Sequence, residues 1–104
     1  MAEKNVADAF VHTGLERWLH ARGIRDLVIA GVSTNNSVEA SARSAGDWGF
    51  ATTVVADACF AFEKRDVGAT LRSAEEAHLM ALANLDGEYA RVAMCDAVIA
   101  ALAG

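Results

Sequence analysis

The chain reads Leu27-Val28-Ile29-Ala30-Gly31-Val32-Ser33-Thr34-Asn35-Asn36-Ser37-Val38 across the segment that decides its fold. The first four residues form a short apolar run of mostly branched side chains, and Gly31 ends it, which predicts a strand covered on both faces. Asn35, Asn36 or Ser37 can then cap a helix. The apolar stripe of that helix comprises Val38, Ala42, Ala45 and Trp48, before Gly49. The segment therefore predicts a strand, a polar turn and a helix.

Helices and apolar strands alternate along the rest of the chain. Thr13-Gly14-Leu15-Glu16 predicts a capping box before a helix that stops at Gly23. Residues 52–56 and 91–94 predict two more strands, and Asp96 predicts the cap of a closing helix through Leu102. Ser73-Ala74-Glu75-Glu76 predicts a second capping box, in a helix whose stripe includes Leu71, Ala74, His78, Ala81, Leu82 and Leu85.

This alternation predicts an α/β fold built from parallel βαβ units. We expect a partial three-layer (αβα) Rossmann-like sheet of about three strands with flanking helices. Residues 1–104 contain no internal boundary signal, so we expect a single domain.

Composition excludes several functional classes. The net charge is −5 and the nine Lys and Arg residues are scattered, so nucleic acid is not an expected partner. No apolar run approaches the roughly 20 residues that span a bilayer, and residues 1–5 lack a signal-peptide core. We expect a cytoplasmic protein with Cys59 and Cys95 reduced and buried. His12 and His20 lie eight positions apart and no Cys or His cluster suggests zinc, so no metal or other cofactor is predicted.

Ser37 lies where ligands gather in this kind of fold. In an open parallel sheet they bind beyond the carboxyl ends of the strands, where helix N-termini offer unpaired N–H groups. Ser37 follows the predicted strand and falls in the first turn of the next helix, so a nucleophile there would find an oxyanion hole. The alternative is that Ser37, Asn35 and Asn36 only cap the helix.

The turn resembles the nucleophile turn of the isochorismatase-like cysteine hydrolases, which reads Gly-Val-x-Thr-x-x-Cys-Val. Gly31, Val32, Thr34 and Val38 match in register, and Ser37 stands at the cysteine position. Upstream, the family's lysine segment is matched by Lys4, Ala9, Phe10, Thr13 and Leu15, while Asp8 replaces a small hydroxyl residue. Downstream matches fall at residues 49, 55–58, 76–78 and 90–92. The resemblance runs in order from about Lys4 to the end of the chain.

The resemblance implies a catalytic set of cysteine, lysine and aspartate. Carried over, Lys4 would stabilise charge near the nucleophile, whose place Ser37 occupies. The family aspartate ends the first strand, in the half of the domain that this chain lacks, and no residue here matches it. A non-proline cis peptide would map to Val32–Ser33, and oxyanion donors to the backbone N–H groups of Asn36 and Ser37.

The serine changes the expected chemistry. A hydroxyl needs a positioned general base, whereas a thiol beside a lysine ionises near neutral pH. Lys4 would have to be neutral to serve as that base, and Asp8 lies where the family does not place one. The resemblance implies hydrolysis of a small-molecule C–N amide or related bond, and with serine at position 37 we expect that activity to be weak or absent. The alternative is a non-catalytic half-domain that forms a homo-oligomeric binding or scaffold protein, or a chain whose missing half another chain supplies.

Five other features have competing interpretations. Cys59 could substitute as nucleophile, but residues 58–62 favour a packed loop with a buried thiol. Cys95 and His78 are interpreted as structural, the histidine as a hydrogen-bonded core or interface residue. Trp18 and Trp48 are interpreted as core or interface aromatics that could also shape a pocket. Residues 63–66 predict a solvated loop of mixed charge, which the resemblance implies can lie near a neighbouring subunit's cleft.

Overall fold

A three-stranded parallel sheet organises the chain, as the alternation of strands and helices predicted. The structure is a computed structural model that describes residues 8–11 and 13–103. In chain order the elements are α1 (Leu15–Ala21), β1 (Asp26–Val32), the π-helical turn η1 (Thr34–Val38), α2 (Glu39–Asp47), β2 (Ala51–Phe60), β3 (Lys64–Arg65), β4 (Leu71–Arg72), α3 (Ala74–Leu85), β5 (Arg91–Ala93) and α4 (Cys95–Ala103). The strand order is β1-β2-β5.

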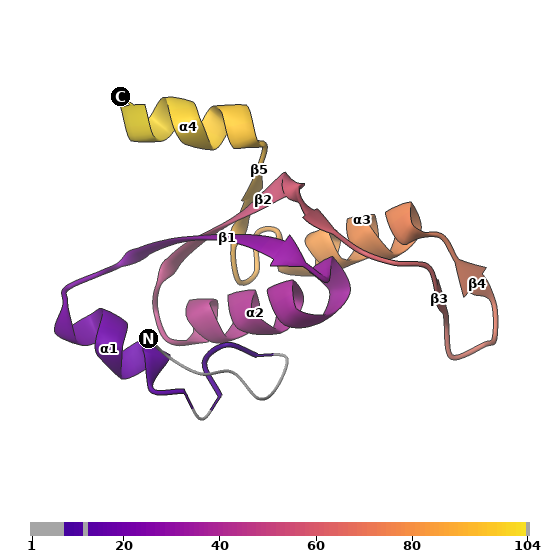
Figure 1. The fold of residues 1–104 in the computed structure, drawn as a ribbon, viewed down its shortest axis with the longest axis horizontal. Helices are drawn as coiled ribbons and strands as arrows, with labels where there is room; N and C mark the ends of the chain where they lie inside the picture. Colours follow the sequence, from indigo (N-terminus) through magenta and orange to yellow (C-terminus); the bar gives the residue numbers. More distant parts are fainter. Residues whose placement is uncertain (1–7, 12, 104) are drawn as a thin grey trace.

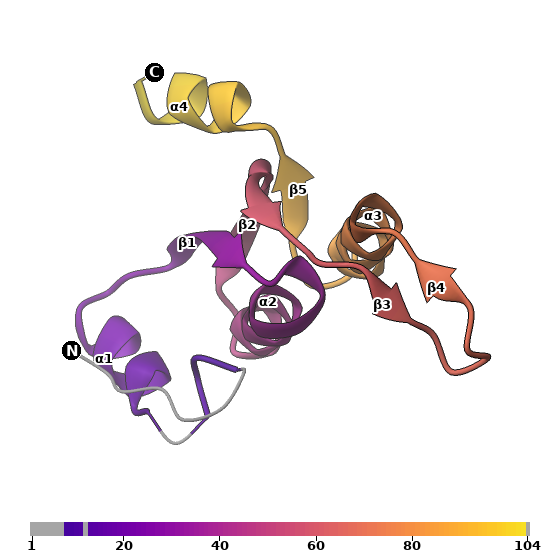
Figure 2. The same cartoon turned by 45° about the vertical axis from the view of Figure 1, so that its right-hand side comes forward.

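The helices divide between the two faces of the sheet. α2 and α3 lie together on one face, whereas α4 lies on the other (Figures 1 and 2). One core cluster joins α2, the sheet and α3: Val38, Ala42, Val54, Cys59, Leu82 and Leu85. A second cluster, of Leu19, Ala45 and Phe50, seats α1 against the end of α2. The result is a layered α/β arrangement of helix, sheet and helix.

β1 and β2 pair in two segments separated by a bulge. Asp26 to Ile29 pair with Ala51 to Val54 in regular register, and the pairing then jumps to Gly31 with Cys59. β2 therefore extends to Phe60, beyond the residues 52–56 predicted for it. Since residues 58–62 belong partly to this strand and Phe60 is 62% exposed, the prediction of a packed loop there is wrong.

Local capping follows the sequence at only one of the helices for which caps were predicted. The Ser73 box is confirmed: its hydroxyl accepts from Glu76 N–H at 3.0 Å, and Glu76 Oε1 accepts from Ser73 N–H at 2.9 Å. α1 instead begins after Gly14 in a left-handed conformation, while Thr13 Oγ1 accepts from Leu15 N–H at 3.2 Å. The Thr13 hydroxyl thus satisfies the first N–H of α1, but the reciprocal box predicted with Glu16 does not form.

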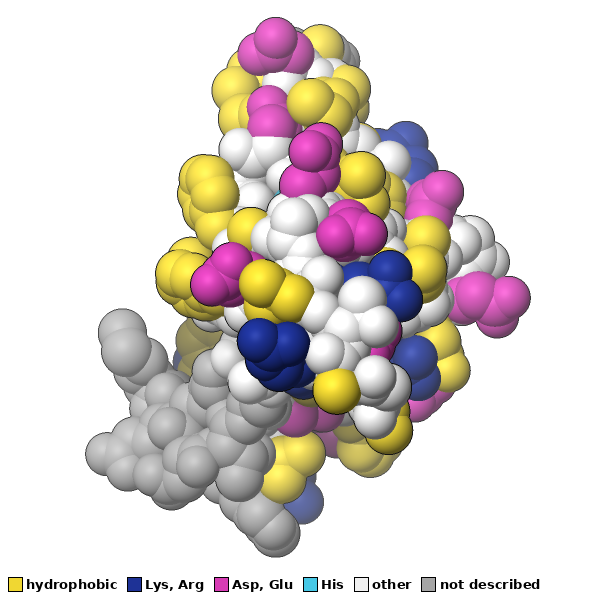
Figure 3. Space-filling view, turned by 90° about the vertical axis from the view of Figure 1, so that its right-hand side faces the viewer, with side chains coloured by type: hydrophobic (Ala, Val, Ile, Leu, Met, Phe, Trp, Pro, Cys, Tyr) yellow, Lys and Arg dark blue, Asp and Glu magenta, His cyan; other side chains and the backbone are white. Residues whose placement is uncertain are grey.

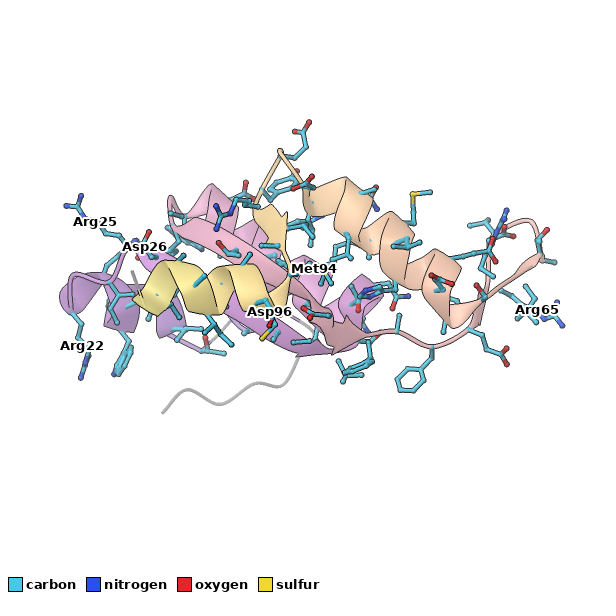
Figure 4. All side chains as sticks on the ribbon, turned by 90° about the horizontal axis from the view of Figure 1, so that it is seen from above. Arg22, Arg25, Asp26, Arg65, Met94 and Asp96 are labelled. Carbon is cyan, nitrogen blue, oxygen red and sulfur yellow. The ribbon has the colours of Figure 1, made fainter. Side chains whose placement is uncertain are left out.

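The caps predicted for α2 and α4 are also wrong. Asn35, Asn36 and Ser37 lie inside the π-helical turn rather than before a helix. Asp96 lies in the first turn of α4, whose first N–H, that of Cys95, is bound at 2.7 Å by Asp57 Oδ1 from the bulge of β2. Figure 4 shows Asp96 at the start of this helix, above the strands. The cap of α4 is therefore supplied by Asp57 in the bulge of β2 and not by a residue next to the helix.

Residues 63–72 form a small hairpin instead of a plain loop. β3 and β4 pair antiparallel, and Arg72 binds Asp66 at 2.8 Å and Glu76 at 3.7 Å. Seen from the hairpin side, acidic and basic side chains are interspersed with hydrophobic ones (Figure 3). The prediction of a loop is wrong in its backbone, although Lys64 and Arg65 are exposed as expected.

The α4 side of the sheet is only partly covered. Val28 and Val32 of β1 are 52% and 54% exposed, so the prediction that this strand is covered on both faces is wrong. Trp18 and Trp48 are also about half exposed, so the core interpretation of these aromatics is wrong, whereas the interface interpretation stays a prediction. The radius of gyration is 14.2 Å, against about 13 Å for a compact domain of this length. Among the described residues, no helix is long and apolar enough to cross a membrane.

Candidate functional site

The turn between β1 and α2 has an unusual backbone. The Val32–Ser33 peptide bond is cis, at the position that the family resemblance indicates. Ser33 is extended, and its carbonyl oxygen accepts hydrogen bonds at 3.1 Å from Asn36 N–H and from Val38 N–H. The second of these spans five residues and makes the turn π-helical, a feature that often marks functional sites. No signal in the sequence predicted this π-helical winding of the turn.

Ser37 lies on this turn, at the rim of an apolar cavity of about 400 Å³. Its side chain is half-buried, and Ser41 follows it one helical turn later on the same rim. The walls come from β1, α1 and the segment before α1, and they include Phe10, Leu15, Leu19 and Val28. The predicted nucleophile position therefore borders a space that could receive the apolar part of a small molecule.

A second, more polar hollow of about 320 Å³ borders the same turn. It is lined by Ser33, Asn35, Asn36, Phe62, Glu63 and Lys64. Lys64 and Glu63 place opposite charges on its rim, beside the exposed ring of Phe62. This hollow lies beyond the carboxyl ends of β1 and β2, where parallel sheets bind ligands.

The first residue of the turn, Thr34, is in contact with α3. Thr34 Oγ1 lies 2.8 Å from Nδ1 of His78, and the Thr34 side chain is fully buried. The interpretation of His78 as a hydrogen-bonded histidine is confirmed. Its partner could not be predicted from the sequence, because the two residues are 44 positions apart.

The other ionisable residues predicted near the site lie elsewhere or outside the described part. Asp8 binds the hydroxyl of Ser44 and accepts from Phe10 N–H at 2.8 Å, and Ala9 N–H binds Ser41 Oγ at 2.9 Å. These contacts fasten the segment before α1 to α2, and Ser44 lies two helical turns beyond Ser37. Lys4 lies outside the residues that the structure describes, so its role stays a prediction.

The oxyanion donors also stay a prediction. The Asn36 N–H already donates to Ser33 O at 3.1 Å, so a substrate oxygen would have to share or replace that acceptor. In the described part of the chain, no three His, Cys, Asp or Glu side chains gather as metal ligands would.

Cys59 does not have the surroundings of a nucleophile. It pairs in register with Gly31, immediately beside the turn, but its side chain is only 3% exposed. Burial raises the pKa of its thiol, although a hydrogen bond with the Gly31 backbone opposes this. A buried neutral thiol is a poor nucleophile, so the structural interpretation is confirmed. Cys95, predicted to be buried, is only half-buried.

Comparisons with known proteins all lead to one family. The isochorismatase domain family model matches residues 1–93. A solved structure of an isochorismatase-family protein from Chromobacterium violaceum ATCC 12472 superposes with a TM-score of 0.94 at 53% identity, over 96% of this chain and 52% of that one. The isochorismatase family protein YrdC of Bacillus subtilis is 35% identical over 92% of this chain and 51% of its own length.

Some of the relatives have named activities. Nicotinamidase 3 of Arabidopsis thaliana is 33% identical over 100% of this chain and 47% of its own length. The chain thus spans about half the length of these relatives.

Proposed function

The chain belongs to the isochorismatase family, and from this premise we propose that it is a hydrolase module for a C–N amide or related bond of a small molecule. Ser37 occupies the nucleophile position in this proposal, and Lys4 stabilises charge beside it. The observation that carries the proposal is the turn, which holds Ser37 at the start of the α2 segment, between an apolar cavity and a polar hollow. The similarity to a nicotinamidase supports an amide as the bond cleaved.

The proposed activity of the chain alone is weak. A serine hydroxyl has to lose its proton to a base as it attacks, and Asp8 is engaged by Ser44. The chain covers about half of its relatives' length, so the base of the complete site would come from outside residues 1–104. A thiol at position 37 needs less help, because a thiolate fraction exists near neutral pH.

The test compares four proteins, namely wild type and three variants, on a panel of small primary amides that includes nicotinamide. Ser37→Cys should form an acyl adduct visible as a mass increase on the peptide that carries residue 37. Wild type should release little ammonia, and Lys4→Ala should release less. Ser41→Cys is the matched control, since it places a thiol one turn further along the same cavity rim. If Ser37→Cys forms no adduct and all variants equal buffer, catalysis by this chain is excluded.

A second proposed role is association through the uncovered side of the sheet. The apolar side chains exposed there include Val28, Val32, Phe60, Met94, Ile99 and Leu102. The accessible surface is 6805 Å², about a fifth more than the roughly 5,600 Å² expected for a monomer of this mass. That excess exceeds the roughly 800 Å² that each partner contributes to a standard interface. Within the described strands, the outer edge of β1 also has no paired strand.

We propose a second copy of this chain as the occupant of that surface. Sedimentation at micromolar concentration should show a dimer or larger species, and Val28→Lys should shift it toward monomer. Leu79→Lys, on an exposed apolar position of α3, is the control that should leave the assembly unchanged. A monodisperse monomer that binds no exposed-surface dye rules out the role. A monomer that binds the dye instead indicates a different chain as the occupant.

A further inference from the structure

The contact between α3 and the turn is made by the first residue of the turn. Thr34 is the first residue of the π-helical turn, and its hydroxyl meets Nδ1 of His78 at 2.8 Å. We propose that His78 is a positioning residue, which orients Ser37 for attack without contacting the substrate. This inference rests on the proposed hydrolytic function and names a further residue of the same site.

Ser37 lies between two buried anchors. Thr34, three residues before it, is 0% exposed, and Val38, immediately after it, is 3% exposed. Val38 is held by apolar packing in the cluster that contains Val54 and Leu82, whereas the Thr34 hydroxyl is held by the histidine. The packing of Val38 keeps this end of the turn buried but does not fix how the turn is rotated, since hydrophobic contacts are non-directional. The hydrogen bond is directional and fixes the rotation of the turn.

The backbone of the turn needs this support. A π-helical turn is wider than an α-helical turn, and Ser33, the residue before it, makes no side-chain capping bond to its backbone in the described structure. The long-range bond between Thr34 and His78 ties the turn to α3, in addition to the local bond from Ser33 Oγ to Asn35 Oδ1 at 2.5 Å.

α3 is a firm platform for the histidine. Its first turn is closed by the Ser73 and Glu76 capping box, and its last turns bury Leu82 and Leu85 in the core. His78 lies between these two fixed ends of α3, so its imidazole stays in place if the π-helical turn is displaced. A shift of the turn therefore breaks the bond, and a shift of about 1 Å in a reacting group can slow a reaction by about a hundredfold.

The test uses a thiol at position 37 as a reporter that does not depend on amide hydrolysis. In a Ser37→Cys, Cys95→Ser background, the alkylation rate by iodoacetamide is measured from pH 5 to 10 by mass spectrometry of the peptide that carries residue 37. Cys59, buried in the same protein, serves as the internal reference for global unfolding. His78→Phe keeps a ring but removes the bond, and Thr34→Val removes the hydroxyl while keeping the shape.

Each of these two variants should slow alkylation about tenfold or move its pH midpoint, and the double variant should be no slower than either single one. His78→Asn, whose amide can take the place of Nδ1, and Thr34→Ser should restore most of the rate. His20→Phe is the matched control: His20 stacks on Phe50 at 4.6 Å on α1, remote in sequence from the turn, and its loss should not change the rate.

The inference is overturned if His78→Phe and Thr34→Val, with Cys59 still protected, leave rate and pH midpoint within twofold of the background. It is also overturned if the double variant shows the product of two independent effects. If either variant exposes Cys59, the conservative variants His78→Asn and Thr34→Ser are used instead. A tenfold loss of alkylation rate in both of them, with Cys59 still protected, contradicts the positioning role. This result can be told apart from a failure of the proposed function. If alkylation of position 37 depends on His78 but no amide is cleaved, the positioning role is supported and the hydrolytic function is not.

Discussion

Gly46→Ala tests the packing that holds α2 in place behind the turn. A Cβ at Gly46 would lie 2.5 Å from the carbonyl oxygen of Tyr89 and 3.1 Å from its carbonyl carbon. An ordinary carbon–oxygen contact is about 3.3 Å, so the two backbones would have to separate by about 0.8 Å. The loop resists this movement, since the N–H groups of Tyr89 and Ala90 both donate to Leu85 O, at 3.0 and 3.2 Å.

Two opposing effects set the size of the change. Alanine is better than glycine in a helix by about 1 kcal/mol, whereas overpacking costs about 1–3 kcal/mol. Since the new Cβ is fixed to the backbone of α2 and the Tyr89 oxygen is a backbone atom, neither can turn aside, so the upper value applies and the net loss of unfolding free energy is about 2 kcal/mol. For a domain of this size the melting temperature should fall by about 10 °C.

Circular dichroism melts and urea unfolding measure this loss. Gly68→Ala is the control, because a Cβ there would meet no atom closer than Asp66 Oδ1 at 3.4 Å, and its stability should change by less than about 0.5 kcal/mol. If Gly46→Ala melts at or above the wild-type temperature, the loop yields and helix propensity dominates. The steric reasoning would then be wrong.

Three further predictions concern capping, acid sensitivity and thiol reactivity. Ser73→Ala removes the cap of α3 and should lower the unfolding free energy by about 1 kcal/mol in urea; an unchanged midpoint contradicts this. A hydrogen bond from the Thr70 N–H and then the Arg72 guanidinium hold the pKa of Asp66 below its usual range. A depressed pKa contributes stability that is lost as pH falls through it, so the protection factors of the hairpin amides, which correct for the intrinsic pH dependence of exchange, should fall below about pH 4, and Asp66→Asn should remove that fall; equal protection factors at pH 3 and 6 refute the prediction. Because burial raises the pKa of Cys59, iodoacetamide should modify Cys95 first in the native protein, and mass mapping that finds Cys59 modified first contradicts the structure.

Much of the fold could be predicted because its signals are local. The Ser73 box needs only residues three positions apart, and Gly23 adopts the left-handed conformation, at φ 68°, that its place after a helix indicates. The three strands follow from short apolar runs, and their parallel order follows from the helices between them. The resemblance around Gly31 to Val38 likewise pointed to the family, which the comparisons confirm.

The features that sequence reasoning missed depend on partners far along the chain. The cap of α4 comes from Asp57, 38 positions before Cys95, and the anchor of the turn comes from His78, 44 positions after Thr34. The exposure of Val28 was also missed, because an apolar side chain indicates what a strand can bury and not whether a neighbour covers it.

The sequence by itself therefore determined the order and type of the main strands and helices, the family, and the position of Ser37 after a strand. Only the tertiary structure decided how the turn is wound, which side chains hold it and which face of the sheet stays open. Local propensity acts between residues a few positions apart, whereas these contacts exist only once separate segments have packed together.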